Sequence, residues 1–137
     1  MLTKPIHGWT ILQLGNFSER ASYLTDIPND CLDAFIHALQ TNNSAIVYFD
    51  AEGFDYHLIS SFYRSYIIRD KENNKVDIHV IEKDILELAK ELVNDIQRDF
   101  DKWLNWESYD DGEYAEVNRE VFREKLSLLN FEINKRK

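Results

Sequence analysis

The residues best suited to chemistry lie in one acidic and aromatic stretch, residues 103–116. Between Glu107 and Glu116 this stretch carries five carboxylates and neither Lys nor Arg. The carboxylates are Glu107, Asp110, Asp111, Glu113 and Glu116, and the aromatic residues among and before them are Trp103, Trp106, Tyr109 and Tyr114. Aromatic anchors inside an acidic rim are typical of a surface that binds a basic protein. The same residues also fit an ordinary role, with the tryptophans in the core and the acids in a solvated turn.

A second acidic loop surrounds Gly53. It contains Asp50, Glu52 and Asp55, and the sequence alone does not place it relative to the first stretch. The candidate partner-binding residues are therefore drawn from both loops: Trp106, Glu107, Tyr109, Asp110, Asp111, Glu113, Tyr114, Glu116, Asp50, Glu52 and Asp55. Trp103 is assigned to the core, because it continues the apolar stripe of the helix expected before it.

Metal and cofactor chemistry finds little support in the residue spacing. Asp110-Asp111-Gly112 resembles part of a calcium loop, but the alignment puts Tyr109 and Asn118 where oxygen ligands are required. Local metal-ligand spacing is also absent from the four histidines, which are His7, His37, His57 and His79. The four glycines are too far apart for a phosphate-binding loop. We therefore expect no resident metal or cofactor.

Cys31 is the single cysteine and so the only thiol nucleophile. It is expected in the first turn of a helix, where a thiol pKa can fall, but it also shares an apolar face with Phe35. A buried, inert thiol is the commoner outcome on such a face. Because 25 acids in 137 residues make chance carboxylate pairs unavoidable, we assign no catalytic residue. The chain is expected not to be an enzyme, and a small enzyme is the least favoured alternative.

Length, charge and cysteine content favour a single cytoplasmic domain. A chain of 137 residues, 44% of them hydrophobic, has the size and core material of one domain. The net charge is −9, and residues 82–116 hold twelve acids against four bases, which disfavours direct nucleic-acid binding and favours a basic protein partner. A single cysteine excludes an internal disulfide, and the sequence predicts neither a signal peptide nor a membrane-spanning helix. A cytoplasmic monomer is expected, without a membrane partner.

The first third of the chain predicts a strand and a helix. Residues 6–14 fit a strand that ends at the Gly15-Asn16 turn. Residues 16–27 fit either a short helix or an extended segment. A helix is expected to begin at Pro28, with Asn29 or Asp30 as its cap, and to end near Thr41.

The middle of the chain predicts two hairpins. Residues 45–59 contain an apolar, aromatic run, a turn at Gly53 and a second run, and residues 62–80 repeat this pattern around a polar turn. Strands followed by helices predict an α+β fold. We expect one domain over residues 1–137, with an antiparallel sheet of about four or five strands packed against three helices.

Two further helices are expected in the last third. Asp84 and Glu87 resemble a capping box, and the apolar stripe behind them predicts an amphipathic helix of about 20 residues that ends near Trp103. Another helical pattern begins at Tyr114. Residues 129–133 fit either the end of that helix or an edge strand.

Residues 45–59, Ala-Ile-Val-Tyr-Phe-Asp-Ala-Glu-Gly-Phe-Asp-Tyr-His-Leu-Ile, resemble the small cytoplasmic immunity proteins of bacterial contact-dependent growth inhibition systems when taken together with residues 103–116. The resemblance is one of general character over the whole chain, and no single motif carries it. It implies an immunity protein that binds and neutralises a cognate toxin domain, frequently a basic nuclease, in a one-to-one complex. Two binding modes remain open: the protein either blocks the toxin's active site directly or binds beside it. The alternative is an adaptor or self-associating interaction module without a toxin partner.

Overall fold

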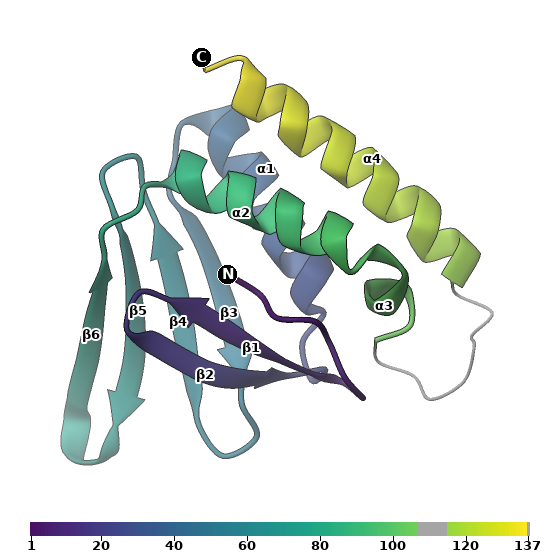
Figure 1. The fold of residues 1–137 in the computed structure, drawn as a ribbon. Helices are drawn as coiled ribbons and strands as arrows, with labels where there is room; N and C mark the ends of the chain where they lie inside the picture. The colour runs from purple at the N-terminus through teal and green to yellow at the C-terminus, as the bar shows by residue number, and fades with distance from the viewer. Residues whose placement is uncertain (107–114, 137) are drawn as a thin grey trace.

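Two antiparallel sheets and a layer of helices make up the described part of the chain (Figure 1). The computed structural model describes residues 1–106 and 115–136. In chain order, the elements are β1 (Trp9–Leu14), β2 (Phe17–Ser22), α1 (Ile27–Thr41), β3 (Ala45–Asp50), β4 (Asp55–Ser60), β5 (Ser65–Lys71), a short 3₁₀ turn (Glu72–Asn74), β6 (Lys75–Ile81), α2 (Ile85–Arg98), α3 (Phe100–Leu104) and α4 (Ala115–Asn134). The predicted α+β fold is confirmed. It has a four-stranded sheet and three long helices, α1, α2 and α4, besides the short α3.

The four-stranded sheet is a meander in the order β3-β4-β5-β6, so both predicted hairpins are confirmed. Strand β5 begins at Ser65, three residues later than the expected run from Phe62. The reason is a tight turn, in which the Ser61 backbone N–H and hydroxyl both donate to the Arg64 carbonyl oxygen, at 3.0 and 2.7 Å. Alternate residues of β3 and β4 are buried, which gives the sheet one inner and one outer face.

A second sheet, the β1-β2 hairpin, crosses the inner face and settles the ambiguity at residues 16–27 in favour of a strand (Figure 1). The Phe17 ring packs edge-on against Tyr56, with the ring centroids 5.2 Å apart. The Tyr56 hydroxyl donates to the Arg20 carbonyl oxygen at 2.9 Å, so it is paired in the core as a buried hydroxyl needs to be. This hairpin therefore closes the inner face beside the helices.

Helix α1 begins one residue before the expected start and is capped differently. Its N-cap residue is Asp26, which makes no side-chain cap bond, so the prediction of Asn29 or Asp30 as the cap is wrong. Pro28 stands in the first turn, where its missing N–H is not needed. Asn29 instead donates from its side chain to the Asp26 carboxylate at 2.9 Å. The expected apolar stripe is confirmed as buried, with Cys31, Leu32, Phe35, Ile36 and Leu39.

Helix α2 has the predicted cap, because the Asp84 carboxylate accepts the Glu87 N–H at 2.9 Å. The expected long helix is broken at Asp99, whose backbone leaves the helical region, and α3 follows as a separate short helix. Residues 129–133 belong to α4, which runs to Asn134, so the edge-strand alternative is excluded.

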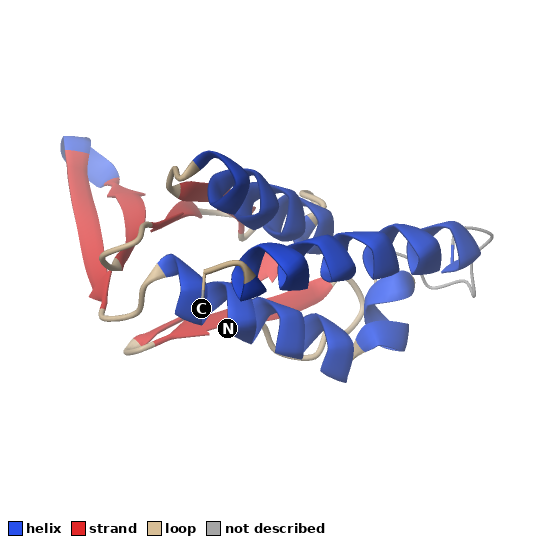
Figure 2. Ribbon diagram, turned by 90° about the horizontal axis from the view of Figure 1, so that it is seen from above, coloured by secondary structure: helices blue, strands red, loops and turns tan. Residues whose placement is uncertain are grey.

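The helices gather on one side of the four-stranded sheet, while its other side is left without a helix among the described elements (Figure 2). Helix α1 packs against β3, and α4 packs against α1 and α2. Arg136 ties the end of α4 to the end of α1, since its guanidinium donates to the Leu39 carbonyl oxygen and to the Asn42 side chain. In residues 1–106 and 115–136 no helix has the length and apolar character needed to cross a membrane.

Candidate functional site

The outer face of the four-stranded sheet carries apolar and aromatic side chains instead of the polar ones usual on a solvated sheet face. We define the outer face by nine residues: Ile46, Tyr48, His57, Ile59, Tyr66, Ile68, Val76, Ile78 and Val80. Ile46 and Ile78 are each 60% exposed, whereas Val47 and Leu58, which lie on the inner face, are buried. Contiguous exposed apolar surface of this kind marks interaction sites in soluble proteins.

Strand register arranges most of the outer face in two continuous cross-strand rows. The first row is Ile46, Ile59, Tyr66 and Val80, and the second is Tyr48, His57, Ile68 and Ile78. Cross-strand neighbours on one face pack against each other, so each row is a continuous ridge across four strands. The Tyr48 and His57 rings show this packing directly, with their centroids 5.1 Å apart. The two rows therefore form a broad contact surface whose side chains are held in place by the strands.

A third row on the same face is acidic. Asp50 and Asp55 face each other across β3 and β4, and Asp70 pairs with Val76 across β5 and β6. The Tyr48 hydroxyl donates to the Asp55 carboxylate at 3.0 Å, which joins the second apolar row to this acidic row. That hydrogen bond is the main reason why the pKa of the Tyr48 phenol is raised above its ordinary value. The outer face thus ends in three carboxylates at the β3-β4 turn and the end of β5.

The structure brings together the three acids of one of the two predicted acidic loops. Asp50, Glu52 and Asp55 all lie in the β3-β4 hairpin, where the Asp50 carboxylate accepts the Glu52 N–H at 2.7 Å. Glu116 is exposed in the first turn of α4, which Figure 1 places away from that hairpin. The structure therefore does not join Glu116 to the hairpin acids.

Trp106 is placed in the core. Only 5% of its surface is exposed, and its ring lies 5.3 Å from that of Trp103, which is fully buried as expected. In this conformation Trp106 is not an exposed anchor, because its indole already fills the space beside α3. The other predicted residues of this stretch lie outside the described residues; they are Glu107, Tyr109, Asp110, Asp111, Glu113 and Tyr114.

The side chains of the outer face are suited to apolar contacts and hydrogen bonds with a partner. Within residues 1–106 and 115–136, no three His, Cys, Asp or Glu side chains are close enough to hold a metal ion. The predicted burial of Cys31 is confirmed, and burial, followed by the charges of Asp30 and Asp26, raises the pKa of its thiol. A thiol held neutral in the core is a poor nucleophile.

Sequence reasoning missed the outer face as a site. Its signal was the Ala45–Phe49 run, in which neighbouring residues are all apolar. Such a run is typical of a strand buried on both faces. Strand β3 has only one face covered within the described chain, so the second apolar face remains available to a partner.

Comparison with protein-family models, with curated proteins and with solved structures finds no match to this chain.

Proposed function

We propose that this chain is a cytoplasmic immunity protein, which binds and neutralises a cognate bacterial toxin domain through the outer face of its four-stranded sheet. The observation that carries the proposal is the pair of exposed apolar rows that end in an acidic row. The resemblance of residues 45–59 to immunity proteins supports it as well, because these residues form β3 and β4, half of the sheet.

The apolar rows supply the contact area of such a complex. Interfaces that hold firmly have an apolar and aromatic centre surrounded by polar groups. The outer face offers this arrangement, with Tyr48 and Tyr66 among aliphatic residues and carboxylates at one end. Strands fix these side chains before binding, which reduces the entropy cost of association.

The acidic row favours a basic partner. Asp50, Asp55 and Asp70 lie on the same face as the apolar rows, and the chain as a whole has a net charge of −9. Complementary charge speeds encounter and disfavours wrong partners. A basic nuclease domain has the matching charge, because its substrate-binding cleft must accept phosphates. Covering that cleft, or the surface beside it, excludes the substrate.

The proposal predicts that the coding region next to this chain encodes a large exoprotein with a basic carboxy-terminal domain, and that domain is the partner for the test. Ile78→Lys should reduce affinity by about 2 kcal/mol or more, roughly thirtyfold, since it puts a charge in the second apolar row of the interface. Val117→Lys is the matched control, because Val117 is 62% exposed against 60% for Ile78 but lies on α4. Isothermal titration calorimetry measures both. Wild-type affinity for Ile78→Lys would rule out the outer face as the binding surface.

A second candidate function is an adaptor or self-associating module, and the same exposed apolar rows favour it. In that case a second copy of the chain covers the outer face. The molar mass of the chain alone distinguishes the two functions when it is measured by light scattering across a wide concentration range. A mass that rises with concentration, and falls back to the monomer in Ile78→Lys, supports self-association. A constant monomer mass supports a different protein as the partner.

A further inference from the structure

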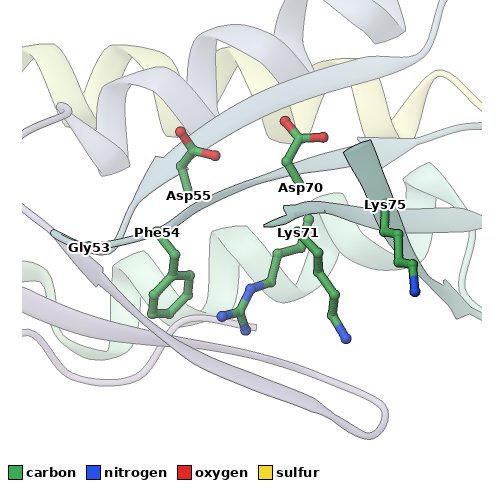
Figure 3. A pocket seen from close by; sticks show the side chains of 7 residues that line it. Gly53, Phe54, Asp55, Asp70, Lys71 and Lys75 are labelled. Atoms are coloured by element: carbon green, nitrogen blue, oxygen red, sulfur yellow. The ribbon is translucent and has the colours of Figure 1, made fainter. Parts of the chain in front are cut away.

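The turn end of the four-stranded sheet separates charge between its two faces. Asp55 and Asp70 point to one side, while Phe54, Lys71 and Lys75 point to the other (Figure 3). The acidic side continues the outer face. The basic side chains border an open surface pocket of about 540 Å³, which Gly53, Arg69, Asp55 and Asp70 also line.

The pocket has an aromatic wall that carries two guanidinium groups. The Arg69 guanidinium carbon lies 4.1 Å from the centroid of the Phe54 ring, and that of Arg20 lies 5.1 Å from it. Arg20 is held in place because its Nε donates to the Ala51 carbonyl oxygen at 3.0 Å. Stacking on an aromatic ring fixes a guanidinium and leaves its N–H groups, which point outward in the guanidinium plane, able to donate to a ligand.

Positive charge is concentrated here in a chain that is otherwise acidic. Residues 1–81 contain six basic side chains, and four of them, Arg20, Arg69, Lys71 and Lys75, meet around this pocket. Two acids offset part of this charge, since Glu19 lies 3.4 Å from Arg69 and Asp77 lies 2.8 Å from Lys71. Asp55 and Asp70 also line the pocket, so the positive charge is confined to the side toward which Lys71 and Lys75 point.

The two lysines form a like-charge pair that the fold neutralises only in part. Lys71 and Lys75 face each other directly across β5 and β6. Like charges at directly opposed positions destabilise a sheet. Asp77 pairs with Lys71 alone, and Lys75 makes no ion pair with the side chains that the structure describes, which exclude that of Glu72. An anion bound between the two lysines removes this repulsion.

We propose that this pocket binds the phosphate group of a small soluble molecule. A phosphate offers several charged oxygens at once, which suits a planar Arg69 fork together with two mobile lysine ammonium groups. Long nucleic acids fit poorly, because the net charge of −9 and the acidic row on the other side of the same hairpin repel an extended polyanion. The proposal is independent of toxin binding, which uses the opposite face of the sheet.

The test is a titration of the full chain with inorganic pyrophosphate and with inorganic phosphate, followed by the amide resonances of the chain in NMR spectra. Sodium chloride at matched ionic strength is the control for screening. The expected result is a saturable shift at Gly53, Phe54, Lys71 and Lys75. Lys75→Gln should weaken the affinity about tenfold, because it removes one charge-assisted contact. Lys90→Gln, which removes the same charge from an exposed position on α2, should leave it unchanged.

Three results would overturn the proposal. One is a shift that sodium chloride reproduces, since that shows screening only. Another is an equal loss of affinity in Lys75→Gln and Lys90→Gln, which shows attraction to overall charge. The third is co-sedimentation with vesicles that contain phosphatidic acid in the absence of pyrophosphate binding, because the phosphate recognised is then that of a lipid surface. Lys75 is exposed and outside every ion pair of the described chain, so its replacement leaves the fold intact.

Discussion

The Tyr48 hydroxyl donates a hydrogen bond to the Asp55 carboxylate at 3.0 Å, across the β3-β4 hairpin. Tyr48 belongs to the second apolar row and Asp55 to the acidic row, so this contact makes one continuous surface of the two. An aromatic residue beside a carboxylate is the combination that the sequence suggests for residues 103–116. Strands β3 and β4 build the same combination from residues that are local in sequence and fixed by the sheet.

The Tyr48–Asp55 contact predicts a change in titration. Asp55→Asn should lower the pKa of Tyr48 toward the ordinary tyrosine value of about 10, because the raised value depends first on this hydrogen bond. The pH titration of the Tyr48 ring carbon resonances measures it. Glu52→Gln is the control, since it removes a carboxylate from the same hairpin without touching the hydrogen bond. An equal shift in Glu52→Gln would mean that the general acidity of the turn, and not this bond, sets the pKa.

The two faces of the sheet predict opposite sensitivities for adjacent residues. Leu58 is fully buried on the inner face, and Leu58→Ala should cost about 2–5 kcal/mol of unfolding free energy because it leaves a cavity. Ile59 lies on the outer face, and Ile59→Ala should cost about 1 kcal/mol or less. Urea unfolding measures both. Equal costs would contradict an uncovered outer face.

Much of the fold follows from short-range signals. The Asp84 cap of α2 lies three residues from the N–H that it accepts, and the β3-β4 turn at Gly53 joins strands that are adjacent in the chain. Local patterns of this kind can be recognised without knowing the rest of the structure. Strand β2 was ambiguous for the opposite reason. Its sequence Phe-Ser-Glu-Arg-Ala-Ser has weak strand preference, and its pairing with β1 and its packing on Tyr56 stabilise it.

The candidate sites depend on which surfaces the fold leaves uncovered. Apolar alternation in β6 shows that Val76, Ile78 and Val80 share a face, but it does not show that the other face is the one that Phe17 of the β1-β2 hairpin packs against. The basic pocket is less visible still, because Arg20 is about 50 residues away from Arg69 and Lys71 in the chain. A count of charges along the sequence does not reveal such a cluster, because its residues come together only when the hairpins pack.

Two buried groups predict a loss of stability at high pH. Burial raises the pKa of the Cys31 thiol and of the Tyr56 phenol in the folded chain. The unfolded chain releases these protons near their ordinary values, about 8.5 and about 10, so above these values the unfolded state binds fewer protons than the folded state. The contribution of these two groups to the free energy of unfolding is therefore fully present below about pH 8.5 and falls as the pH rises above it.

Urea unfolding between neutral and alkaline pH measures this loss. Tyr56→Phe should make the decline less steep, although it also costs about 1 kcal/mol at neutral pH through the lost hydrogen bond to Arg20. Tyr63→Phe is the control, because Tyr63 is 91% exposed and its replacement should preserve the decline. A decline of the same steepness in Tyr56→Phe would mean that the phenol does not contribute.

Asp95 predicts that the amino-terminal segment and α2 are energetically coupled. Its carboxylate is nearly buried and accepts the Leu2 N–H at 2.8 Å and an Arg98 N–H at 3.1 Å. Asp95→Ala leaves the Leu2 N–H without its partner and should cost about 1–3 kcal/mol of unfolding free energy. Asp101→Ala, at an acid whose side chain is 83% exposed, should stay within about 0.5 kcal/mol. Chemical denaturation gives both values, and faster hydrogen exchange of the Leu2 amide in Asp95→Ala locates the loss. Equal stability of the two variants would show that the Leu2 amide is satisfied by water instead.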